Sequence, residues 1–141
     1  MIDGKRFPFT KRVSSLGVSG MMPYLQLKLT YRQRSVQVTG LLDTGASVNV
    51  LPYDIGFQLG AIWEEQTKSL RLGGNLARLQ ARGLVVSATV DEFPPVLLAF
   101  AWTESNDVPL ILGHGNFFTG FDVCFYRSDL AFEVRPSRTQ A

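Results

Sequence analysis

The sequence has 141 residues, enough for one domain with a hydrophobic core and too few for two. Hydrophobic residues make up 45% and charged residues 18% of the chain, which excludes a disordered protein and favours a compact one. The formal net charge is only +2, and the basic residues are scattered without interleaved aromatic residues, so we expect no nucleic acid partner.

Alternating apolar residues predict a β-hairpin early in the chain. Leu25, Leu27 and Leu29 alternate with polar residues, which is typical of a half-buried strand. The polar stretch 32–35 then predicts a turn into a second alternating strand over residues 36–42.

The middle of the chain is less regular. Residues 48–51 predict a short buried strand, and residues 53–60 predict a helical turn that ends at Gly60. Residues 61–83 have leucines at a spacing that permits a helix, but the pair Gly73-Gly74 costs about 1 kcal/mol per glycine in a helix interior. We therefore predict a hairpin with a glycine tip.

The second half of the chain continues the β pattern. A single helical turn is expected at residues 117–118, and residues 136–141 form a polar tail. Many short strands with one or two short helices predict an all-β domain whose sheet is closed or strongly curved. The strands are expected at residues 84–90, 96–102, 108–112, 121–126 and 130–134.

The sequence also indicates in which cellular compartment the protein is expected. Cys124 has no second cysteine to pair with, and the apolar run 121–126 favours a buried structural thiol over a nucleophile. The N-terminus lacks the apolar stretch of a secretory signal, and the longest mostly apolar segment, residues 94–102, is too short to cross a bilayer. We expect a soluble, cytoplasmic protein with no membrane partner; a processed fragment of a larger precursor would have the same features.

Two sequence motifs are candidates for a catalytic site. In Leu41-Leu42-Asp43-Thr44-Gly45-Ala46-Ser47, two apolar residues lead a strand into the core and the chain then turns at an acidic residue. A carboxylate in such a place is costly to bury without a partner. Asp-Thr-Gly occurs only once in the chain. The second motif is Leu110-Ile111-Leu112-Gly113, followed by Gly115-Asn116-Phe117-Phe118.

The first motif resembles the active-site signature of aspartic peptidases, and the second resembles the apolar-apolar-Gly element that precedes the helix of retropepsins. The resemblance covers residues 23–134 and implies the closed, barrel-like retropepsin fold. In that family the strand that ends in glycine, here Ile111, Leu112 and Gly113, passes the Asp-Thr-Gly loop. Residues 1–22 form an N-terminal extension that can supply an interface strand, and residues 135–141 form the polar tail.

The resemblance implies a homodimeric aspartic endopeptidase, because the chemistry needs two facing carboxylates and each chain carries one. Two carboxylates near contact share a proton and titrate as a coupled pair. In the implied mechanism, the ionised Asp43 takes a proton from a bound water, which attacks while the partner's Asp43 donates a proton to the peptide carbonyl. The substrate is an extended peptide or protein bound as a strand. No cofactor and no metal is expected.

The resemblance also assigns roles to the residues that follow Asp43. Thr44 bonds backbone across the dimer axis and stiffens the two loops. Gly45 permits the turn and leaves room for the substrate backbone, and Ala46 keeps the floor of the cleft small.

The family's flap and charged brace are less clear in this chain. A flap that closes over substrate is assigned to Leu72, Gly73 and Gly74, with an ordinary surface hairpin as the alternative. Retroviral enzymes often carry an acidic residue and an arginine where this chain has Ser47 and His114. The charged brace is therefore missing or replaced by a weaker hydrogen bond, with His114 as a structural contact rather than a catalytic base.

The termini differ from the family as well. Pro136 should interrupt strand pairing, so the tail is not expected to continue an interface sheet, and Phe7-Pro8-Phe9 is the alternative segment. Three alternatives to the enzyme remain open. The chain can be a catalytically inactive dimerisation or peptide-binding module, a monomer in which Asp43 only caps a tight turn, or one half of an assembly with a different subunit.

Overall fold

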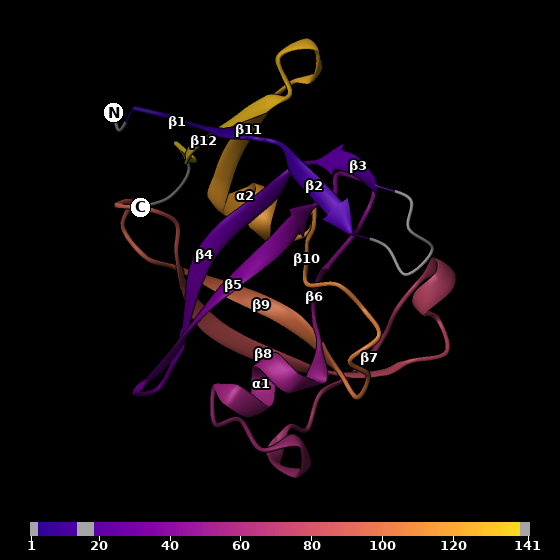
Figure 1. Ribbon diagram of the computed structural model, residues 1–141. Coiled ribbons are helices and arrows are strands. Elements are labelled where there is room, and N and C mark those ends of the chain that lie inside the picture. The colour runs from indigo at the N-terminus through magenta and orange to yellow at the C-terminus, as the bar shows by residue number, and fades with distance from the viewer. Residues whose placement is uncertain (1–2, 14–18, 139–141) are drawn as a thin grey trace.

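The computed structural model describes residues 3–13 and 19–138 and shows an all-β domain with short helices (Figure 1). Within these residues, six strands close into a barrel in the order β4-β5-β10-β6-β9-β8, because β8 also pairs with β4. Strand β7 (Ser69–Arg71) lies beside β8 and extends the sheet. The barrel strands are β4 (Tyr24–Tyr31), β5 (Arg34–Leu42), β6 (Asn49–Leu51), β8 (Gln80–Thr89), β9 (Val96–Thr103) and β10 (Ile111–Leu112).

The remaining elements flank the barrel. The two ends of the chain meet in a small antiparallel sheet in the order β1-β12-β11, and β2 pairs with β3 in a separate ribbon. These strands are β1 (Lys5–Pro8), β2 (Thr10–Val13), β3 (Ser19–Met22), β11 (Phe121–Tyr126) and β12 (Ala131–Pro136). The helices are α1 (Tyr53–Gln58) and α2 (Phe117–Gly120), and the 3-10 turns are η1 (Trp63–Glu65), η2 (Gly74–Leu76) and η3 (Arg127–Asp129).

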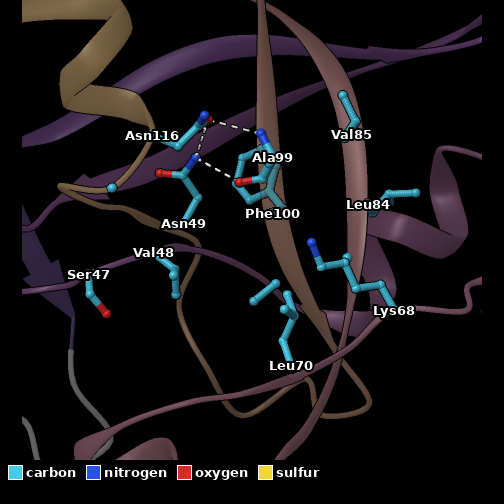
Figure 2. A pocket seen from close by; sticks show the side chains of 13 residues that line it. Ser47, Val48, Asn49, Lys68, Leu70, Leu84, Val85, Ala99, Phe100 and Asn116 are labelled. Carbon is cyan, nitrogen blue, oxygen red and sulfur yellow. Dashed lines mark hydrogen bonds between the residues drawn. The ribbon is translucent and has the colours of Figure 1, made fainter.

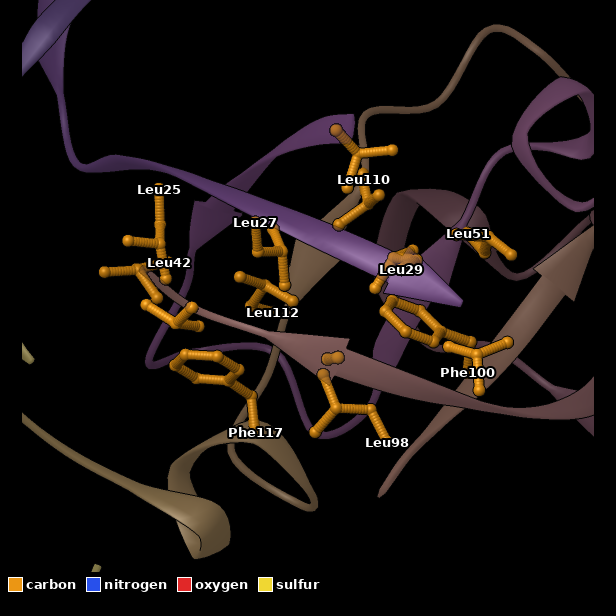
Figure 3. Packing of buried hydrophobic residues seen from close by; sticks show 14 of the residues in the cluster. Leu25, Leu27, Leu29, Leu42, Leu51, Leu98, Phe100, Leu110, Leu112 and Phe117 are labelled. Atoms are coloured by element: carbon orange, nitrogen blue, oxygen red, sulfur yellow. The ribbon is translucent and has the colours of Figure 1, made fainter. Parts of the chain in front are cut away.

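The core fills the barrel with leucine and phenylalanine side chains (Figure 3). Successive side chains of a strand point to opposite faces, so the alternating leucines of β4 all point inward. Leu25 and Leu29 are 0% exposed and Leu27 is 2% exposed. Full burial of one such side chain contributes about 1.5–3 kcal/mol.

Strand β10 runs between β5 and β6 and so places the second motif against the first. Ile111 pairs with Leu41 in parallel and with Val50 in antiparallel orientation. Gly40 allows the close approach, because a Cβ there would lie 2.8 Å from a methyl group of Leu110. The chain that leaves β5 and the chain that leaves β10 therefore emerge side by side at the same end of the barrel.

Most of the predicted elements are confirmed. The hairpin over residues 25–42 is formed by β4 and β5, and the helical turn over residues 53–60 contains α1. The predicted strands over residues 96–102 and 121–126 lie within β9 and β11, and the strand over residues 84–90 matches β8 as far as Thr89. The closed all-β fold is also confirmed.

Several boundaries were wrong. The strand predicted over residues 108–112 is reduced to β10, although Val108 and Leu110 are buried. The hairpin with a glycine tip predicted within residues 61–83 is present, because β7 pairs with β8 in antiparallel orientation, but its loop contains the 3-10 turn η2 instead of a tight glycine turn. Strand β12 continues through Pro136, which pairs with Phe121 of β11. Pairing of β12 with β1 ends at Val134, so the proline has a strand neighbour on one side only, where a missing N–H is tolerated.

The expectation of a buried Cys124 was also wrong, because this thiol is exposed. It lies on β11, an edge strand of the terminal sheet, with Asp122 and Phe125 also exposed. An apolar run on such an edge strand is not covered on both faces. In the described part of the chain, no helix has the length and apolar character needed to cross a membrane.

An ion pair ties β1 to the turn between β8 and β9. Lys5 Nζ donates to Asp91 Oδ2 over 2.7 Å. The hydrogen bond from Lys5 lowers the pKa of Asp91, and the same bond raises the pKa of Lys5. The stabilisation by Asp91 is thus present above the ordinary aspartate pKa of about 4 and is lost as the pH falls through the lowered pKa of the folded state. The contribution of Lys5 is present below about pH 10 and is lost as the pH rises through its raised pKa.

We therefore expect Asp91→Asn to lower the melting temperature at pH 7 by a small amount, on the order of 2 °C, because both groups are exposed to solvent. The difference from wild type should vanish near pH 2 and shrink in high salt. Asp107→Asn is the matched control, since Asp107 forms no ion pair with any described residue. An equal loss in the control, or a loss that persists at pH 2, would contradict the ion-pair account.

Candidate active site

Asp43 begins a tight turn directly after the buried end of β5. Its backbone N–H donates to the carbonyl of Leu112 over 3.0 Å, and its own carbonyl accepts a bond from the N–H of Ala46 over 3.2 Å. Its Oδ1 accepts a hydrogen bond from the N–H of Gly45 over 2.9 Å. The carboxylate is half-buried, and Oδ2 accepts no hydrogen bond from the described residues. One carboxylate oxygen is therefore held by the turn, and the other remains available to a ligand.

The segment after β10 packs directly on the loop that follows Asp43. A Cβ at Gly113 would lie 3.0 Å from the carbonyl oxygen of Ala46 and still closer to that of Val48, so only glycine fits. The N–H of His114 donates to the carbonyl of Ala46 over 2.7 Å. The N–H of Gly115 likewise donates to the carbonyl of Ser47 over 2.9 Å. Backbone hydrogen bonds thus fix the position of the second motif relative to the first.

The side-chain brace between Ser47 and His114 is not seen, because both side chains are exposed and no hydrogen bond joins them in the described chain. The imidazole lies near Phe118, with 6.3 Å between ring centroids. The charged brace of retroviral enzymes is absent, and the expected substitute is made by backbone groups rather than by side chains.

Sequence reasoning missed a buried amide that holds the site together (Figure 2). Asn49 is fully buried, and its Oδ1 accepts a hydrogen bond from the N–H of Gly113 over 2.8 Å. Its Nδ2 donates to the carbonyl of Ala99 over 3.0 Å and to Oδ1 of Asn116 over 2.9 Å. Oδ1 of Asn116 also accepts from the N–H of Ala99 over 2.9 Å. The amide pair of Asn49 and Asn116 joins β6, β9 and the start of α2. The sequence feature that could have revealed it is a single polar residue, Asn49, between Val48 and Val50.

Asp43 and the flap candidate line one cavity of about 560 Å³, which we name the Asp43 cleft. The 43–48 loop forms one wall, and Leu72, Gly73 and Gly74 form another. Gly74 has a φ of +60°, a left-handed conformation that favours glycine. The remaining lining residues are Leu41, Val50, Leu76, Pro109 and Ile111.

A second hollow of about 340 Å³ lies on the Thr44 side of the loop. Met22, Pro23 and Phe125 line it together with Asp43 and Thr44, so β3 and β11 contribute to it. Phe125 is exposed, as is Thr44. We name this surface the Thr44 face. Among the described residues, no group of three or more His, Cys, Asp and Glu side chains is arranged to hold a metal ion.

The fold resembles that of a solved retropepsin-like aspartic protease from Rickettsia conorii, with a TM-score of 0.60 and 12% sequence identity. The likeness covers 96% of this chain and 100% of that one. No protein-family model and no curated protein matches the sequence. At this identity the likeness establishes the fold, which is retropepsin-like.

Proposed function

We propose that the chain is an aspartic endopeptidase that acts as a homodimer. The observation that carries the proposal is the Asp43 cleft, where a carboxylate with one available oxygen lies opposite the Gly73-Gly74 loop. A carboxylate beside a hollow that can hold an extended chain is what general acid–base hydrolysis of a peptide requires. The retropepsin-like fold supports the same function.

In the proposed reaction, the Asp43 carboxylate and the partner's Asp43 carboxylate share one proton, because two adjacent negative charges repel strongly. The ionised member removes a proton from a water molecule, and that water attacks the peptide carbonyl carbon. The protonated member donates to the carbonyl oxygen, and the resulting tetrahedral intermediate collapses with protonation of the leaving amine. The Gly73-Gly74 loop limits the access of bulk water once substrate is bound.

The Thr44 face is the surface through which we propose that a second copy approaches. It is largely apolar and it borders Asp43, so contact there brings the two carboxylates together. The terminal strands β1 and β12 already pair with each other in one chain, and an interface of interleaved termini is not needed to complete that sheet.

The test is cleavage of a diverse peptide library by the purified wild-type chain from about pH 4 to about pH 7, the range in which a proton-sharing pair loses its working form. Sedimentation of the same sample reports whether it is dimeric. Cleavage that is present in the wild-type chain and absent in Asp43→Asn supports the peptidase. No cleavage at any pH by a folded dimer would contradict it.

An inactive peptide-binding module is the second candidate function. It is favoured by the hydrogen bond from Gly45 to Asp43, which a carboxylate with a purely structural role would also make. It predicts a dimer that binds peptides without cleaving them. A monomer with neither activity would leave Asp43 as the cap of a turn.

A further inference from the structure

Another pocket, of about 380 Å³, lies beside the Asp43 cleft, and we name it the outer pocket. Figure 2 shows its lining, which comes from β8, β9, the chain around β7 and the loop after Asp43. Val48 and Leu70 supply apolar side chains, and Val85 is more than half exposed at its edge. Gly83 leaves room, since a Cβ there would meet the Lys68 and Leu70 side chains only at 3.8 and 3.9 Å.

The outer pocket adjoins the Asp43 cleft. Ser47 and Val48 line both hollows. On the other wall, Leu70 faces the outer pocket and Leu72, two residues further along the chain, faces the cleft. A peptide that lies along the cleft and continues past Ser47 and Val48 therefore reaches the outer pocket with residues that are distant from the bond at Asp43.

The charge of the outer pocket is set by one side chain. Lys68 is the only charged residue in its lining, and it forms no ion pair with any described carboxylate. Figure 2 shows its nitrogen turned toward Ala99 and Phe100, across the pocket. Ser47 and Val48, on the opposite side, carry no charge. The pocket thus combines apolar walls with an unpaired ammonium group and no acid to neutralise it.

We propose that the outer pocket binds an acidic side chain, glutamate above all, of the peptide substrate. The methylene groups of glutamate pack against Val48 and Leu70, and its carboxylate accepts a charge-assisted hydrogen bond from Lys68. The substrates of this chain are then peptides with an acidic residue several positions away from the bond that is cleaved. This inference rests on the proposed function, and it makes Lys68 a specificity-determining residue that takes no part in the chemistry.

The test is a set of matched peptides that carry Glu, Gln or Lys at each position away from the cleaved bond. For the wild-type chain we expect one position at which Glu raises kcat/KM about tenfold over Lys, because the exposed ammonium of Lys68 attracts the one charge and repels the other. Lys68→Glu should reverse that preference, and Lys68→Met should remove it without reversal. Lys28→Glu is the matched control, because Lys28 is exposed and lines neither hollow. Cleavage with the same Glu and Lys preference in wild type and Lys68→Glu would overturn the inference and leave the proposed function standing.

Peptide binding to the Asp43→Asn chain separates the two claims. If no peptide is cleaved, the proposed function fails, and fluorescence anisotropy of labelled Glu and Lys peptides still reports on the pocket. Tighter binding of the Glu peptide, reversed when Lys68→Glu is added, supports the acidic subsite in a binding module. Equal binding of both peptides, or none, overturns it.

Discussion

The Asp43→Asn chain should fold and dimerise as the wild-type chain does, yet cleave peptides at least about 1000-fold more slowly. Asparagine has the same shape as aspartate, and its Oδ1 can still accept the hydrogen bond from Gly45 that closes the turn. It cannot take a proton from water or share one with the partner's Asp43. Steady-state cleavage of the best library peptide, with circular dichroism and sedimentation of both proteins, measures the difference.

Mixtures of the two chains test whether the site is shared. When wild-type and Asp43→Asn chains are refolded together in varying ratio, activity should follow the square of the wild-type fraction, because a working dimer needs two intact copies. Independent sites would give a linear dependence. A linear result, or a purified Asp43→Asn chain that keeps its activity, would exclude the paired-carboxylate mechanism.

The barrel was predictable because its strands bury one face and the sequence records this with a period of two. Leu25, Leu27 and Leu29 are a direct example. The terminal sheet was not predictable in the same way. Its pairing of Lys5 with Val134 joins the two ends of the chain, and no local pattern encodes a contact of that range. The same sheet made the Cys124 expectation wrong, since an apolar run on an edge strand looks like a buried one.

The two motifs of the site were visible because their residue types are unusual where they stand. An acid after two core leucines and a glycine at the end of a buried strand both break the local pattern. The interactions that join the motifs were not visible. The bonds from His114 and Gly115 use backbone atoms, which any residue carries, and Asn49 is one amide in an apolar run whose partners lie 50 to 67 residues away.

Gly113→Ala should be the most destabilising single-methyl change at the site, with a loss of about 3 kcal/mol in the free energy of unfolding. The added Cβ would overlap the carbonyl oxygen of Val48 and press on that of Ala46, and these are backbone atoms that cannot rotate away. The 43–48 loop must then move as a whole. Asp43 would move with it, because its N–H bonds to the carbonyl of Leu112, the residue before the substitution.

Gly73→Ala is the matched control, since it adds the same methyl group to another wall of the same cleft. No heavy atom lies within 4 Å of the Cβ position there, and the φ of −97° suits any residue. We expect it to change the free energy of unfolding by no more than about 1 kcal/mol, in the stabilising direction. Urea denaturation of both variants gives the comparison. Equal urea midpoints for the two variants would contradict the close packing of the two motifs. A Gly113→Ala chain that is less stable, and that also loses cleavage well below its melting temperature, would show that this packing positions the Asp43 carboxylate.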